Sequence, residues 1–119
     1  MSFASYRDLI VWQKAMELVK EVYILTKKLP KDELYKLSAQ MRGAAVSIPS
    51  NIAEGYARYG KKEYAHFLSI AKGSKAELET QLLVCVCVGY LSETDIEAAM
   101  NISEEVGKMF STLTKNLGD

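Results

Sequence analysis

The sequence predicts an all-α protein that folds as an antiparallel, up-down-up-down four-helix bundle, with its second helix kinked near Pro49. Two observations favour this fold. Apolar residues recur at steps of three and four through most of the chain, which is the spacing of one helix face. Turn signals interrupt this pattern around Pro30, Gly60 and Gly89, and such short connections force neighbouring long helices to run antiparallel.

Length and composition are those of one compact domain spanning residues 1–119. The chain has 119 residues, of which 49% are hydrophobic, enough to bury a single core. Fifteen basic residues balance fifteen acidic ones, so any binding to nucleic acid or an anionic membrane must come from a local patch. The beginning of the chain does not resemble a signal peptide, and no apolar run has membrane length. We therefore expect a cytoplasmic protein with no membrane partner.

The first predicted helix covers residues 8 to 28 and carries two apolar stripes. The first stripe comprises Leu9, Trp12, Met16, Val19, Tyr23 and Thr26. The second stripe comprises Val11, Ala15, Leu18, Val22, Leu25 and Leu29. A helix in a monomeric bundle needs one stripe, so two stripes predict either wide contact with two neighbouring helices or contact with another copy of the chain.

The second predicted helix follows Pro30, and Asp32 and Glu33 suit its first turn. Its apolar stripe keeps its phase through Pro49 and consists of Leu34, Leu37, Met41, Ala45, Ile48 and Ile52. A proline in a helix interior removes a backbone donor and costs about 3 kcal/mol. The continuous stripe therefore predicts one bent helix rather than two separate helices. Residues 58–62 form the expected connection to the third helix.

The third predicted helix covers residues 61 to 89, with Gly73 and Ser74 permitting the close approach of a neighbour. Residues 82 to 88 are apolar on every side and contain strand-favouring valines, but no turn signal precedes them, so we expect a helix buried on more than one side. Cys85 and Cys87 have neither zinc-site nor redox spacing and are expected to be buried, reduced thiols. A capping pattern at residues 92–95 begins the fourth helix, which runs to Leu117.

No group of reactive side chains converges in the sequence, which predicts a non-enzyme without a cofactor, a metal or a small-molecule substrate. His66 is the single histidine and is expected on a helix surface. Glu77 and Glu79 point to different helix faces and do not form the carboxylate pattern of a di-iron bundle. The glycines form neither a phosphate-binding loop nor a dinucleotide fingerprint.

The most unusual stretch of the sequence is residues 47–55, where a proline and small polar residues interrupt a helical pattern. Asn51 and Glu54 lie three residues apart and could bond to each other or to a neighbouring helix. The favoured interpretation is that they satisfy backbone groups freed by the proline. The residues that define this structural motif are Ser47, Pro49, Asn51, Glu54 and Gly55.

Basic residues around the second and third helices are the candidates for a nucleic-acid interface. They are Arg42, Arg58, Lys61, Lys62, Lys72 and Lys75. Tyr56, Tyr59 and Tyr64 lie between them, a composition suited to phosphate contact and base stacking. The alternative interpretation is a solubilising helix surface, because acidic residues lie nearby. An oligomer would repeat the patch and strengthen binding by avidity.

Five segments together resemble the 23S rRNA intervening-sequence protein family of bacteria. They are residues 9–15, 29–35, 40–42, 47–55 and 67–74, and the stretch 47–55 is the most specific. The resemblance implies a small four-helix bundle, loosely called a ribosomal protein, that forms pentameric rings and has no established enzymatic activity. It also implies distant relatives, the accessory variability proteins of diversity-generating retroelements, which bind a reverse transcriptase and nucleic acid. Gly43 departs from the family pattern, which commonly has a second basic residue after Arg42.

Taken with the resemblance, the sequence predicts a non-catalytic homopentamer that binds RNA or a ribonucleoprotein through the six basic residues. The alternative is a protein-interaction scaffold, or an accessory subunit for a partner enzyme such as a reverse transcriptase. Both predictions require the apolar side chains to exceed what one bundle can bury.

Overall fold

The computed structural model describes residues 5–58 and 60–117 and is all-helical over these ranges, as the sequence predicts. Four helices make up the molecule: α1 (Ile10–Thr26), α2 (Leu37–Ala57), α3 (Lys61–Cys87) and α4 (Glu93–Leu117). Two short 3-10 turns, η1 (Tyr6–Asp8) and η2 (Lys31–Glu33), precede α1 and α2. The predicted class, four helices without a strand, is confirmed for the residues described.

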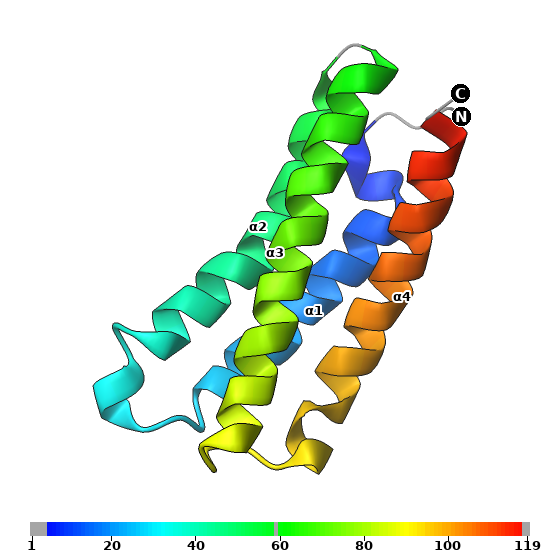
Figure 1. Cartoon of the computed structure of the whole chain (residues 1–119). Coiled ribbons are helices and arrows are strands. Elements are labelled where there is room, and N and C mark those ends of the chain that lie inside the picture. The colour runs from blue at the N-terminus through cyan, green and yellow to red at the C-terminus, as the bar shows by residue number, and fades with distance from the viewer. Residues whose placement is uncertain (1–4, 59, 118–119) are drawn as a thin grey trace.

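The helices form a closed square in which α2 and α4 each contact both α1 and α3. Figure 1 shows that α2 ends and α3 begins at one end of the bundle, whereas the connections from α1 to α2 and from α3 to α4 lie at the other end. The molecule measures 44 × 25 × 22 Å. Neighbouring pairs therefore enclose one core, and grooves lie on the outside between α1 and α2, between α1 and α4, and between α3 and α4.

Only one of the two apolar stripes of α1 enters the core completely. The buried residues of this stripe are Val11, Ala15, Leu18, Val22 and Leu25. In the other stripe Trp12 and Val19 are half-buried against the core, whereas Met16 and Tyr23 are 43% and 38% exposed. Wide contact with neighbouring helices thus accounts for part of the second stripe and leaves the rest uncovered.

The α2 helix begins later than the sequence predicts. Residues 31–33 form a 3-10 turn, Lys36 has a non-helical backbone, and the α-helix starts at Leu37. The carboxylate of Glu33 accepts a hydrogen bond from the Leu37 amide at 3.4 Å, so Glu33 caps the helix from outside instead of belonging to its first turn. As a consequence Leu34 is 44% exposed and does not join the core stripe.

Pro49 lies inside α2, which continues without interruption from Leu37 to Ala57. Ile48 and Ile52 beside it are fully buried, and Pro49 itself is buried. Packing on the core side therefore keeps the segment in one helix despite the missing backbone donor. The expected bend near Pro49 stays a prediction.

The close approach between α2 and α3 occurs at Gly55, not at Gly73. A Cβ atom added to Gly55 would lie 2.8 Å from the Cβ of Phe67, whereas one added to Gly73 would meet nothing within 4 Å. The prediction for Gly73 is wrong because that residue lies on the exposed side of α3. Ser74 does meet α2, where its Oγ lies 2.8 Å from the Oγ of Ser47.

The apolar run near the end of α3 is helical through Cys87, as predicted, but it is not buried on more than one side. Leu82 and Cys85 are fully buried, whereas Leu83 and Val88 are 54% and 56% exposed. Cys87 is exposed, contrary to expectation. Residues two apart on a helix point in nearly opposite directions, so Cys85 and Cys87 cannot both face the core.

Local signals end α3 and begin α4 as the sequence predicts. Gly89 has a φ of 86°, and the Tyr90 amide turns back to donate to the Cys85 carbonyl at 2.8 Å. Ser92 and Asp95 form a reciprocal cap in which each backbone amide donates to the other side chain, at 2.9 and 3.0 Å. The α4 helix then buries Ile96, Ala99, Ser103, Val106 and Phe110.

We predict opposite effects of alanine at two glycines of α2. Gly55→Ala should destabilise the protein by about 1–3 kcal/mol, because its Cβ overlaps a fixed Cβ of α3 and the helices must separate. Gly43→Ala is the matched control and should stabilise by about 0.5–1 kcal/mol, since its Cβ meets nothing and alanine favours the helix. Urea unfolding followed by circular dichroism measures both changes. Equal effects at the two positions would contradict the close approach.

Candidate nucleic-acid interface

The structure divides the six predicted basic residues among three places. Arg58, Lys61 and Lys62 lie where α2 ends and α3 begins. Lys72 and Lys75 lie in the middle of α3, on the side that faces α4. Arg42 lies sixteen helical residues before Arg58, which places it about 24 Å away along α2. The six residues therefore do not form one continuous patch on a single copy of the chain.

Arg42 connects α2 to α1. Its Nε donates to the buried hydroxyl of Thr26 at 2.8 Å, and its guanidinium lies 4.7 Å from the centre of the Tyr23 ring. These contacts hold the half-buried side chain in place at the α1–α2 contact. Arg42 thus has a structural role that the sequence does not reveal.

Arg58 is neutralised by neighbouring carboxylates. Its guanidinium lies 2.7 Å from Glu54 and 3.6 Å from Glu63, and it stacks 5.1 Å from the Phe67 ring. The hydrogen bond and the charge of Glu54 raise the pKa of Arg58 above its ordinary value. Two carboxylates beside one guanidinium reduce its attraction for a phosphate.

Lys75 belongs to a hydrogen-bonded contact between α3 and α4. Its Nζ lies 2.9 Å from the Glu79 carboxylate, which also accepts a hydrogen bond from the buried Ser103 hydroxyl. Burial raises the pKa of Glu79, but these hydrogen bonds and the Lys75 charge outweigh burial, so the pKa lies below its ordinary value. The stem of Lys75 passes so close to Gly107 that an added Cβ there would lie 2.8 Å from it.

Lys61, Lys62 and Lys72 are the candidates that stay exposed, and none of them makes an ion pair within the described residues. The tyrosines are less available. Tyr56 and Tyr64 are half-buried and pack edge to face at 6.0 Å, and Tyr59 lies outside the described residues. Phosphate contact by lysine is therefore better supported than base stacking on tyrosine.

The polar residues of the 47–55 motif join α2 to α3. The Asn51 amide donates to the carbonyl and the hydroxyl of Ser47 at 2.8 and 2.9 Å, and that hydroxyl also meets Ser74. Asn51 and Glu54 do not bond to each other, since Glu54 binds Arg58. The expectation that Asn51 and Glu54 bind backbone groups freed by the proline is also wrong. Pro49 leaves the carbonyl of Ala45 without a donor, whereas Asn51 binds the carbonyl of Ser47.

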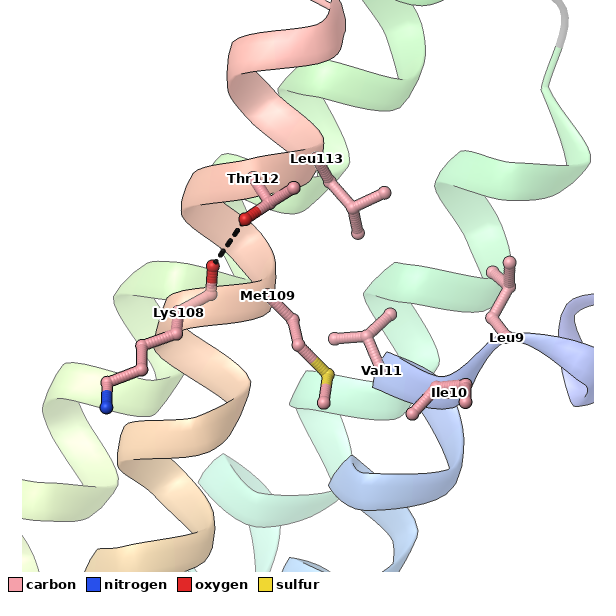
Figure 2. A pocket seen from close by; sticks show the side chains of 7 residues that line it. All are labelled: Leu9, Ile10, Val11, Lys108, Met109, Thr112 and Leu113. Atoms are coloured by element: carbon pink, nitrogen blue, oxygen red, sulfur yellow. Dashed lines mark hydrogen bonds between the residues drawn. The ribbon is translucent and has the colours of Figure 1, made fainter.

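An apolar groove lies between the start of α1 and the end of α4 (Figure 2). It has a volume of about 350 Å³, and its apolar lining comes from Leu9, Ile10, Val11, Met109 and Leu113. Lys108 and Thr112 stand at its edge, where the Thr112 hydroxyl donates to the Lys108 carbonyl at 3.2 Å. The groove offers apolar contact and no pair of reactive groups.

A second groove, between α3 and α4, contains two lysines that the sequence analysis missed. Lys115 lines the part nearer the start of α3, and Lys108 lines the part beside Lys75. Their spacing of seven residues places both on one face of α4, which is the signal that could have identified them. Lys72 faces the same groove from α3.

Titratable side chains are scattered elsewhere on the molecule. His66 is exposed and packs against Phe67 at 5.3 Å. Over residues 5–58 and 60–117, no three metal-ligating side chains come together. Nor does this part of the chain include a helix with the length and apolar character needed to cross a membrane.

Comparison with known proteins identifies a family and a solved structure that are similar to this chain. Residues 7–112 match the profile of a family described as 23S rRNA-intervening sequence protein. No curated protein matches the chain. Among solved structures, it is similar to a protein of unknown function from the S23 ribosomal protein family of Bacteroides thetaiotaomicron. The TM-score is 0.82 and the sequence identity 24%, with 89% of this chain and 99% of that chain covered. A likeness at this identity shows a common fold.

We predict that Glu79 makes stability depend on acidity. Because the folded-state pKa of Glu79 is lowered, its contribution is present above its ordinary value of 4.5 and is lost as the pH falls through the folded-state pKa. Glu79→Gln should lower the free energy of unfolding at pH 7 by about 1 kcal/mol and flatten its decline below pH 4.5. Glu104→Gln, at an exposed residue of α4, is the control and should change little. Identical pH profiles for Glu79→Gln and the unmodified protein would refute this role.

Proposed function

We propose, because the chain belongs to the 23S rRNA-intervening sequence protein family, that it acts as a non-catalytic homo-oligomer that binds RNA or a ribonucleoprotein in the cytoplasm. The proposal of RNA binding rests mainly on one observation, the exposed lysine pair Lys61 and Lys62 in the first turn of α3. The free backbone amides of a helix start add partial positive charge beside these ammonium groups. Together they make this end of the bundle attractive to phosphate.

Glu63, which lies next to this lysine pair, reduces the positive charge of the surface only a little. Glu63 follows directly in sequence, but its carboxylate lies 3.6 Å from Arg58 and is partly neutralised there. Lys72 lies eleven residues after Lys61, three turns along the same side of α3. The lysines can therefore contact successive phosphates along one strand, which positions RNA without reading its sequence.

Self-association is supported by apolar side chains that the bundle leaves outside. Those exposed by 40% or more are Ile10, Met16, Ile24, Leu34, Tyr35, Val46, Ile70, Leu83, Val84 and Val88. Several gather at two grooves on opposite sides of the square. One lies between α1 and α2 and includes Met16 and Val46, and the other lies between α3 and α4 and includes Leu83 and Cys87. Such surfaces on a small protein are typical of interfaces.

The two grooves differ in the charges around them. Glu93 and Glu97 line the groove between α3 and α4. Lys20 lies four residues after Met16, which lines the groove between α1 and α2, and therefore lies on the same side of α1. Opposite charges favour a head-to-tail contact in which the α1–α2 groove of one copy meets the part of the α3–α4 groove lined by Leu83 and Glu93 in the next. Contacts of this kind generate a ring where the rotation between copies closes, and the family resemblance implies a ring of five copies.

A non-catalytic role is supported by where the shifted pKa values occur. The backbone hydrogen bond from Ser92 lowers the pKa of Asp95 at the start of α4, and the hydrogen bond to Glu33 raises the pKa of Tyr90. Asp95 lies in the first turn of α4, and Tyr90 lies in the connection before it. Burial, together with the charge of Glu33, raises the pKa of the nearby Cys85 thiol and so opposes formation of a reactive thiolate. These shifts are therefore explained by structure rather than catalysis.

We predict that charge reversal at the start of α3 weakens RNA binding at low salt. The variant is Lys61→Glu with Lys62→Glu, which leaves the helix intact because acidic residues suit its first turn. Fluorescence anisotropy with a structured rRNA fragment across a salt series should show the salt slope reduced by about 2. Lys31→Glu with Lys36→Glu is the matched control, since it makes the same change of charge at exposed positions at the other end of the bundle.

Two results would contradict the RNA assignment. One is the absence of binding by the unmodified protein at 50 mM salt, and the other is equal binding by the charge-reversed variant and its control. Either result would favour the alternative function, an accessory subunit for a partner enzyme. In that case a purified complex would retain one stoichiometric protein after nuclease treatment.

A further inference from the structure

The α3–α4 groove near the start of α3 combines lysines, hydroxyl groups and an apolar floor. Its volume is about 400 Å³. Leu68 and Phe110, 1% and 2% exposed, form the floor. The exposed residues Ser69 and Lys72 from α3, and Ser111, Thr114 and Lys115 from α4, line its sides. Figure 1 shows that the start of α3 and the end of α4 lie at the same end of the bundle.

This part of the groove is positively charged. Lys72 and Lys115 are its two ionisable lining residues, and neither makes an ion pair within the described residues. The groove continues toward the middle of the bundle, where Glu79 and Glu104 offset Lys75 and Lys108. The excess of positive charge is therefore confined to the end of the groove nearest Lys61.

The lining chemistry fits a sugar-phosphate backbone. Its three hydroxyl groups can donate hydrogen bonds to phosphate oxygens or accept them from ribose hydroxyls, and its two ammonium groups can pair with phosphates. Its apolar floor suits the carbon face of a sugar. An acidic protein segment would also pair with the lysines, but it would leave fewer partners for the three hydroxyls.

The size of the groove selects a single strand. Two packed helices have axes about 8–10 Å apart, so the groove between them admits one chain and not a duplex. Lys61 continues the line of positive charge about 16 Å from Lys72 along α3, which is long enough for several phosphates in succession. A small free anion would occupy only part of this length.

We propose that the α3–α4 groove, floored by Leu68 and Phe110, holds the phosphodiester backbone of a single RNA strand against Lys72 and Lys115. The inference rests on the proposed RNA-binding function and gives that function a defined path across the surface. It includes Lys115, which lies outside the six basic residues predicted from the sequence.

The first test removes the two charges. The probe is a fluorescein-labelled 12-nucleotide oligouridylate, titrated with the full chain at salt concentrations from 50 to 500 mM. Lys72→Gln with Lys115→Gln should reduce the salt slope by about 1.4, because each single-strand phosphate contact contributes about 0.7. Over the measured decade from 500 to 50 mM salt, the unmodified protein should therefore gain roughly 25-fold more affinity than the variant. Lys31→Gln with Lys36→Gln removes the same charge at exposed positions at the other end of the bundle and should leave the slope unchanged.

The second test blocks the groove without changing its charge. Ser111 is exposed and lines both the charged end of the groove and its continuation toward the middle of the bundle. Ser111→Trp should therefore fill the groove while α4 stays folded. The affinity and the salt slope should then both fall, as expected for the variant that lacks the two lysines. Circular dichroism of each variant confirms that the helices are intact.

The outcomes separate this inference from the function on which it rests. If the unmodified protein binds the oligouridylate and both groove variants bind like the control, the groove assignment is overturned and RNA binding stands. If the unmodified protein does not bind at 50 mM salt, both the groove assignment and the RNA-binding function are overturned. Tighter binding of linear polyphosphate or of a 12-residue oligoglutamate than of the oligouridylate would also overturn the RNA assignment of the groove.

Discussion

The unequal burial of apolar side chains is the constraint on which the rest of this structure depends. Each helix buries one apolar stripe in the core, and the closed square of four helices covers a second stripe only in part. The second stripe of α1 and the outer side of the apolar run in α3 therefore stay at the surface, where Met16, Leu83 and Val88 are about half exposed. Hydrophobic surface of this extent favours association with another chain. The proposed assembly, and the repetition of the basic surface in it, depend on these uncovered apolar side chains.

The tight contact between α2 and α3 sets the position of the basic surface. Gly55 lets Phe67 approach, and Ser47 and Ser74 meet about two turns of α3 further along. These contacts fix the first half of α3, which carries Lys61, Lys62 and Lys72. The residues of the 47–55 motif therefore act on structure directly and on binding only through the position of α3.

Most of the fold could be predicted from the sequence because local signals specify it. The cap at Ser92 and Asp95 and the turn at Gly89 use short-range hydrogen bonds that sequence patterns encode. The candidate site could not be predicted in the same way, since the pairing of a charge depends on residues from other elements. Lys75 is paired with Glu79 against α4, whereas Lys115 joins Lys72 only because the opposite ends of the α3–α4 segment come together in one groove.

The mass of the protein in solution tests the central claim most directly. Light scattering on the unmodified chain at micromolar concentration should give one species of about 66 kDa, five copies of the 13.3 kDa chain. A ring of this kind would hide the exposed apolar residues of α1 and α3 between neighbouring copies. A single species of 13.3 kDa, soluble at the same concentration, would show that the exposed stripes need no partner and would contradict the account.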